Sequence, residues 1–427
     1  MSRGRWPIRI VCLLVVLAAA GVLLDAAGGA LVRHLGGNWR HAPEDARWLL
    51  SDAAQALVAR AYDGLDGPVR DYRAYLLSTG GNGGDGYDNR SYVHPRFLHG
   101  WRPRSRLYGA AIADAAGVRD MARADVEYIA RLVRLARSLP HEHRIRLAAL
   151  DQRYDGDGRP LPDATAYYVD NDYVADIAER HSDLFRPVVS VHPYRRDALD
   201  ALQRWAGRGV DAVHWWPAVQ GFDPSDERLD PYYRTLVEND LMLIVRTGDA
   251  AGLVDGDRGH GNPWHLRRAL AQGVRVVLSG AGGAARYPDP EADTDGDGGT
   301  PRISGIAMFL RLLRASGDNG RLYADLGGIV HHERVPGGLA ELLQHPDAFD
   351  RLVYASGYPL PAVNAAADPA TLAEHGFVTG DQAAALAEIR DVNPLLFDFV
   401  AKRLARLPHT DLGLPPSAFT RDIVTEP

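Results

Sequence analysis

Eight short apolar segments with amphipathic stretches between them constrain the fold of this chain more than any other feature. They cover residues 69–77, 144–150, 187–192, 210–216, 241–245, 274–279, 321–326 and 351–356. Several of the intervening stretches have helical periodicity and end in Gly or Asn, residues favoured just past a helix. Strands alternating with helices over roughly 300 residues predict an α/β fold, a parallel (β/α)8 TIM barrel. Its functional site should lie at the C-terminal ends of the strands.

The amino-terminal segment differs in character from the rest of the chain. Arg3, Arg5 and Arg9 precede an apolar run of fifteen residues at 10–24, and a weaker apolar stretch continues to Val32. The run alone suits a signal segment, whereas the length up to Val32 suits a tilted transmembrane helix. We favour an uncleaved, single-pass anchor in the cytoplasmic membrane. The arginine flank then predicts that the remainder lies on the extracytoplasmic, periplasmic side.

The sequence predicts four regions. Residues 1–33 form the membrane anchor or signal segment, 34–67 a linker and helical lead-in, 68–410 the barrel, and 411–427 a C-terminal tail. A net charge of −7 and a pI near 6.1 provide no basic footprint for nucleic acid. The single cysteine, Cys12, lies in the apolar run, so we expect no disulfide and no thiol chemistry in the exported part.

Motifs at and after the strand ends resemble those of a known family. They are DPSDERLDPYY at 223–233, TGD at 247–249, YP at 358–359 and NPLLFDFV at 393–400. Residues 66–405 resemble the amidohydrolase-related, metal-dependent hydrolases of the decarboxylase-like branch. The resemblance implies an amidohydrolase-type barrel whose active site would use zinc or another divalent metal.

The positions at which this family places its metal ligands hold other residues. Arg73 and Tyr75 replace the His-x-His pair of the first strand, and Arg246 replaces the histidine after the fifth. Gly280 and Gly357 replace the sixth-strand histidine and the eighth-strand aspartate. Arginine stays protonated and repels a cation, and glycine offers no side-chain ligand. We therefore expect a degenerate site with no metal and no other cofactor.

A lysine of the fourth strand, which bridges two metals in some members of the family, is also missing. The fourth strand offers His214 instead, and the only lysine of the chain is Lys402, near its C-terminal end. This pattern excludes the lysine-bridged two-metal chemistry.

The polar residues that remain near the strand ends predict a site for a small carboxylate or phosphate. Arginine side chains bind such groups through paired N–H donors. The expected ligand-binding residues are Arg73, Tyr75, His192, His214, Arg246 and Asp325. In the alternative, the arginines pair with nearby carboxylates of Asp71, Asp249 or Asp325, of which Asp325 is the expected partner.

Three functions are compatible with this pattern. The first is a membrane-anchored barrel that has lost metal-dependent hydrolysis and acts as a binding or scaffold protein for a small anion. The second is a metal-free or atypical hydrolase or decarboxylase with His192 or His214 as general base. In the third, only the protein surface is used. We favour the first.

Overall fold

The computed structural model describes residues 30–37, 49–80, 88–95, 103–248, 258–292, 300–317 and 320–424. Of the predicted membrane anchor, residues 1–33, only residues 30–33 lie within these ranges, and residues 1–29 lie outside them. Among the described residues, no helix has both the length and the apolar character that a membrane crossing requires.

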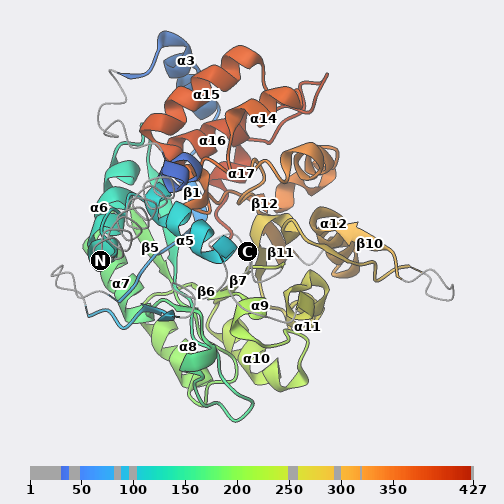
Figure 1. Cartoon of the computed structure of the whole chain (residues 1–427). Helices are drawn as coiled ribbons and strands as arrows, with labels where there is room; N and C mark the ends of the chain where they lie inside the picture. The colour runs from blue at the N-terminus through green and yellow to red at the C-terminus, as the bar shows by residue number, and fades with distance from the viewer. Residues whose placement is uncertain are drawn as a thin grey trace, which may run out of the picture.

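All eight predicted strands are present, and they pair in parallel (Figure 1). Hydrogen bonds order three of them as β1-β3-β5 and five as β6-β7-β8-β11-β12. A parallel bridge between Val189 and Val213 joins β5 to β6, and the Tyr72 N–H donates to the Tyr354 carbonyl to join β1 to β12. The strands therefore close into the predicted barrel. They are β1 (Val69–Tyr75), β3 (His143–Ala148), β5 (Phe185–Val188), β6 (Ala212–Trp215), β7 (Met242–Val245), β8 (Val276–Leu278), β11 (Leu322–Asp325) and β12 (Leu352–Val353).

Amphipathic helices cover the outside of the barrel. In α6 (Ala124–Arg137) the side chains of Tyr128, Leu132 and Leu135 are buried, at the three- and four-residue spacing of one helix face. The other longer helices are α3 (Asp52–Tyr62), α5 (Pro103–Ala115), α7 (Asn171–Arg180), α8 (Ala198–Gly207), α10 (Asp230–Glu238), α12 (Gly305–Ala315), α15 (Gly380–Val392) and α16 (Pro394–Leu404). The shorter ones are α9 (Pro217–Gln220), α11 (Arg267–Ala271), α13 (Ala340–Leu343), α14 (Pro369–Glu374) and α17 (Ser417–Thr420). Two short antiparallel pairs lie in the loops, β2 (Tyr92–Val93) with β4 (Tyr167–Tyr168) and β9 (Arg286–Pro288) with β10 (Arg302–Ser304).

Strand alternation decides which side chains enter the barrel. The apolar interior contains Val188, Ala212, Ile244, Val277 and Ala355. Because successive residues of a strand face opposite sides, adding two to each number gives the next interior layer toward the C-terminal ends. That layer consists of Ser190, His214, Arg246, Ser279 and Gly357, together with Asp325, which stands two residues beyond Tyr323. Polar side chains therefore begin at the C-terminal end of the barrel, which we call the mouth.

The C-terminal residues close the opposite end of the barrel, which we call the floor. Ile423 is 1% exposed and belongs to the interior cluster. Its N–H donates to the hydroxyl of Tyr72 at 3.0 Å, and this hydroxyl donates to the Arg421 carbonyl at 3.1 Å. Residues up to 424 therefore contribute to the barrel core.

Replacing Ile423 by Ala should destabilise the whole barrel. The substitution removes buried apolar atoms from the floor and should lower the free energy of unfolding by about 2–5 kcal/mol. Urea unfolding of the purified chain followed by circular dichroism would measure the change. The matched control is Val237→Ala, whose side chain is 41% exposed and whose loss should cost less than about 0.5 kcal/mol. Equal effects of the two substitutions would contradict the floor assignment.

Candidate functional site

Arg73 and Asp325 form a two-point ion pair at the barrel mouth. The Arg73 Nε atom lies 2.9 Å from Oδ2 of Asp325, and Nη2 lies 3.0 Å from Oδ1. Oδ1 also accepts the N–H groups of Gly280 at 2.7 Å and Gly327 at 2.8 Å. Burial acts to raise the pKa of Asp325, but Arg73 and these N–H donors hold it below its usual value. The pair joins β1 to β11, and Asp325 is the partner that the sequence predicted.

An irregularity in β1 brings Arg73 and Tyr75 to this position. The register between β1 and β3 shifts between Asp71 and Ala74. As a consequence Tyr72 and Tyr75, three residues apart, both contact the barrel interior. A strand without such a bulge would place residues three apart on opposite faces.

The Arg73 guanidinium occupies the space beside the glycines at the expected metal-ligand positions. A Cβ atom on Gly357 would lie 3.5 Å from Nη1 of Arg73, and one on Gly327 would clash with Nη2. A Cβ atom on Gly280 would lie 2.9 Å from the Gly327 carbonyl oxygen and 3.1 Å from Nη1 of Arg334. Gly280 and Gly357 have φ angles of +59° and +65°, which disfavour any other residue. These glycines therefore leave room for buried guanidinium groups.

Arg246 is a second cation at the mouth, with a different environment. Its guanidinium carbon lies 3.9 Å from the ring centre of Trp216 and 5.1 Å from that of Tyr75. In the described part of the chain no carboxylate is recorded within ion-pair distance of Arg246; Asp249, one of the expected partners, lies outside that part. Aromatic rings stabilise a cation without neutralising it. Among the described residues, Arg246 is therefore stabilised by aromatic rings and is not neutralised by an ion pair.

His214 lies beside these residues with one ring nitrogen unused. Nδ1 lies 2.9 Å from the Ala149 carbonyl oxygen, so Nδ1 carries the proton that it donates and Nε2 is a hydrogen-bond acceptor. Nε2 is buried and has no partner among the described residues. Its ring centre is 6.0 Å from that of Tyr75. Burial, together with the charges of Arg73 and Arg246, lowers the pKa of His214 to about 3, although the Ala149 hydrogen bond acts to raise it.

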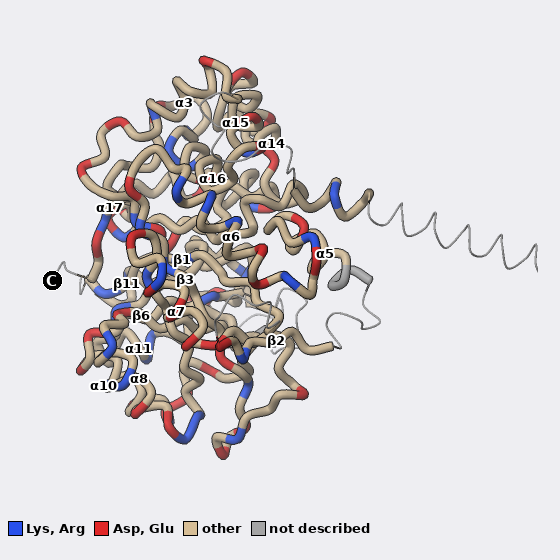
Figure 2. The backbone as a smooth tube through the Cα atoms, turned by 90° about the vertical axis from the view of Figure 1, so that its left-hand side faces the viewer, with Lys and Arg blue, Asp and Glu red and all other residues tan. Residues whose placement is uncertain are grey.

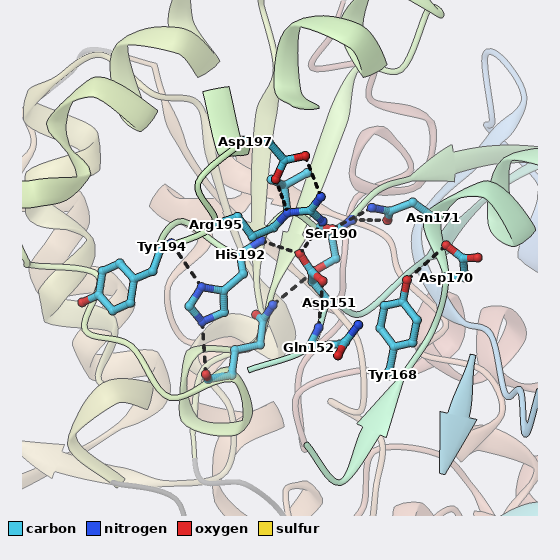
Figure 3. A network of polar contacts seen from close by, with 12 residues as sticks. Asp151, Gln152, Tyr168, Asp170, Asn171, Ser190, His192, Tyr194, Arg195 and Asp197 are labelled. Carbon is cyan, nitrogen blue, oxygen red and sulfur yellow. Dashed lines mark hydrogen bonds and ion pairs between the residues drawn. The ribbon is translucent and has the colours of Figure 1, made fainter. Parts of the chain in front are cut away.

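His192, the other candidate base, has both ring nitrogens engaged by the backbone (Figure 3). Nδ1 accepts the Tyr194 N–H at 3.2 Å, and Nε2 donates to the Gln220 carbonyl at 3.2 Å. The side chain is fully buried against the rings of Tyr154, Tyr194 and Phe222. His192 therefore fixes the loops after β5 and β6, and the structure does not bring it into contact with the two arginines.

Asp151, just after β3, binds the loop that follows β5. One of its oxygens accepts the His192 N–H at 2.8 Å and Nη1 of Arg195 at 3.1 Å, as Figure 3 shows. Nearby, Asn171 bonds the backbone of Ser190 on both sides, and the Ser190 hydroxyl donates to the His214 carbonyl at 2.7 Å. This network sets the position of His214. In the sequence, the signal of this network is an aspartate directly after the predicted strand at 144–150.

Further unpartnered polar atoms lie at the strand ends. The hydroxyl of Thr247 after β7, the hydroxyl of Ser279 after β8 and Nε2 of His331 after β11 are buried without a hydrogen-bond partner among the described residues. A buried polar group without a partner costs about 1–3 kcal/mol, unless water or a ligand bonds to it. The sequence did not identify these three residues as site residues, nor Trp216 as a support for Arg246.

These residues do not match the donor set of a divalent metal. Zinc takes neutral imidazoles, thiolates or carboxylates at about 2.0–2.3 Å, and a fixed guanidinium repels it. Within the ranges that the structure describes, no three or more His, Cys, Asp or Glu side chains come together in a way that could hold a metal ion. The carboxylate of Asp325, at the mouth, is bound by Arg73.

Comparisons with known proteins place the chain in a family. Residues 149–394 match the family described as Amidohydrolase, and no curated protein matches the chain. Among solved structures, an uncharacterised TIM-barrel protein from Bordetella bronchiseptica is 19% identical, with 68% of this chain and 86% of that chain covered and a TM-score of 0.44. A putative 2-pyrone-4,6-dicarboxylic acid hydrolase from Pseudomonas putida is 18% identical, with 68% and 83% covered and a TM-score of 0.39.

A third solved structure is a 5-carboxyvanillate decarboxylase from Novosphingobium aromaticivorans with bound manganese. It is 18% identical, with 51% of this chain and 68% of that chain covered and a TM-score of 0.33. The family match covers more than half of the chain and includes the strand ends from β5 to β12. This chain belongs to the amidohydrolase family, as its strand-end motifs indicated.

Proposed function

We propose that this protein is a membrane-attached, catalytically degenerate amidohydrolase that binds a small carboxylate or phosphate at the barrel mouth. The observation that carries the proposal is Arg246, a cation held between two aromatic rings with no recorded carboxylate partner in the described residues. An anion of the ligand would complete its charge balance. The membrane attachment follows from the amino-terminal sequence alone.

Arg246 and His214 would contact the ligand, and Tyr75 would line the site. The guanidinium provides donors for an oxygen anion, and the unpartnered Nε2 of His214 accepts a hydrogen bond. Arg73 and Asp325 take the alternative role expected of them, as partners of each other and not as ligand contacts. They neutralise each other, so they shape the site and contribute no net charge to ligand binding.

The low pKa of His214 favours binding over the alternative of metal-free hydrolysis. A general base works best when its pKa is near the working pH. With a pKa near 3, the neutral imidazole of His214 has little tendency to take a proton. His192 has no free ring nitrogen for that role. The same arrangement leaves His214 well suited to accept a hydrogen bond.

The purified full chain should contain no stoichiometric zinc or manganese, even after growth with both metals. The donor set around Arg73 would repel a divalent cation. Elemental analysis by mass spectrometry would measure the metal content. Gly357→Asp should not restore binding, because the new carboxylate would lie beside Arg73 and pair with it. One metal ion per wild-type chain would contradict the proposal.

Acetate or inorganic phosphate should raise the thermal unfolding temperature of the full chain, because a ligand that binds the folded state stabilises it. Arg246→Gln should weaken this binding by about 10- to 100-fold, the equivalent of about 1.5–3 kcal/mol for a charge-assisted contact. The matched control is Arg267→Gln, since Arg267 also stacks on a tryptophan, at 4.2 Å from the ring of Trp264. A similar loss in both variants, or no stabilisation of the wild type, would argue against the site.

Acetate affinity should stay constant within about 2-fold between about pH 5.5 and 8. His214, with its pKa lowered to about 3, remains neutral throughout this range, so its hydrogen-bonding state does not change. A histidine that titrated near its usual value of about 6.5 would gain a positive charge below that pH and bind anions more tightly. Calorimetric titration at several pH values would test this, and an affinity that rises as the pH falls through 6.5 would contradict the assignment.

A further inference from the structure

The first described residues are fixed to the body of the protein. Residues 30–35 are helical, and the carbonyl oxygens of Leu35 and Gly36 accept the N–H groups of Ala365 at 3.1 Å and Asn364 at 2.6 Å. The next residue, Gly37, donates its N–H to Oδ2 of Asp114 at 3.0 Å. Gly36 is buried, and a Cβ atom there would clash with Asp114. Three hydrogen bonds therefore attach residues 35–37 to the body of the protein, and the Gly36 backbone lies close to Asp114.

This attachment lies on the mouth side of the barrel. Asn364 and Ala365 belong to the loop that follows the C-terminal end of β12, and Asp114 belongs to α5, in the connection that follows β1. The neighbouring Ala366 carbonyl accepts the N–H of His332, in the loop that follows β11, at 2.9 Å. All three segments follow strands, and the C-terminal ends of parallel strands lie at one end of a barrel.

The overall views agree with this placement. In Figure 2 the helical residues 30–35 project from the body on the side of α5 and β2, whereas the C-terminus lies on the opposite side. The C-terminal Ile423 packs into the floor. The two ends of the described chain therefore leave from opposite ends of the barrel.

The sequence just before this attachment is the apolar run at residues 10–24. About eleven residues separate Leu24 from Leu35, which corresponds to about 16 Å as a helix and at most about 40 Å fully extended. Leu31, within the helical residues, is 46% exposed and continues the apolar character away from the body. A tether this short, fixed at Gly36, limits how far the barrel can turn away from a membrane that holds the run.

We infer that the barrel mouth faces the membrane, and that the anion it binds is the head group of an amphiphile located in the bilayer surface. The tether brings the mouth, with Arg246 and His214, toward the head-group region. Exposed loops after β11 and β12 then lie nearest to the bilayer. This inference rests on the proposed function, because it assigns the source of the ligand for the same site.

Fluorescence quenching in vesicles would test the orientation. In a Cys12→Ser background, Glu333→Cys places a label on the exposed loop after β11, and Glu238→Cys places one at the exposed end of α10, just before β7 begins at the floor. Each labelled full-length variant is inserted into phosphatidylcholine vesicles that contain nitroxide-headed lipid. The label at position 333 should be quenched several-fold more than the label at 238. Equal or reversed quenching, or failure of the protein to float with the vesicles, would overturn the inference.

Ligand source is tested on the same vesicles. Laurate, a long-chain carboxylate that partitions into the bilayer, should protect the full chain from thermal unfolding at a lower total concentration than acetate. Arg246→Gln should raise the concentration needed for either effect by about 10- to 100-fold. If acetate and laurate act equally, the amphiphile assignment fails while the anion site stands. Should neither anion protect the wild type while the label at 333 is quenched, the proposed function fails and the orientation stands.

Discussion

The ion pair between Arg73 and Asp325 determines what the barrel mouth can do. It spans the interior from β1 to β11, and Asp325 also binds the backbone N–H groups of Gly280 and Gly327. Removing either charged partner would leave an unpaired buried charge, at a cost of about 3–5 kcal/mol. The pair is therefore part of the fold as well as of the site. Its net charge is zero, beside the positions at which the resemblance to the family implies metal ligands.

The pair and the glycines around it depend on one another. A side chain at Gly327 would clash with the Arg73 guanidinium, and one at Gly357 would lie in contact with it. A carboxylate placed at position 357 alone would lie beside Arg73 and pair with it. It would then not be free to bind a metal. A divalent-metal site here would require the removal of Arg73 together with several coordinated changes. The substitutions that distinguish this mouth are thus coupled through space, although they are far apart in the sequence.

The barrel could be predicted from the sequence because strand and helix periodicities are local properties. All eight strands were located, and the interior layer that contains His214, Arg246 and Asp325 follows from alternation. The packing of Ile423 into the floor was not predicted, because a contact between residue 423 and Tyr72 leaves no local pattern.

The roles of the polar residues were harder to predict, because each role depends on which hydrogen-bond or ion-pair partner the side chain meets in the folded structure. Sequence alone treated Arg73 and Arg246 alike, but only Arg73 meets a carboxylate in the described residues. His192 and His214 also looked equivalent as candidates. The backbone of the β5 and β6 loops uses both nitrogens of His192 and only one of His214. The bulge in β1, which turns Tyr75 inward, has no marker in the sequence VRDYRAY.

A mouth of this composition is selective by charge balance. The neutral pair at its centre offers nothing to an anion, and His214 is neutral because burial and two nearby cations oppose its protonation. Among the described residues no ion pair neutralises Arg246, and the rings of Tyr75 and Trp216 stabilise its charge. Electrostatic attraction is stronger where water is displaced. An anion that reached Arg246 would therefore gain more than it would at an exposed arginine, whereas a cation would be repelled. Under the proposed function, the same residues would disfavour a metal and favour an anion.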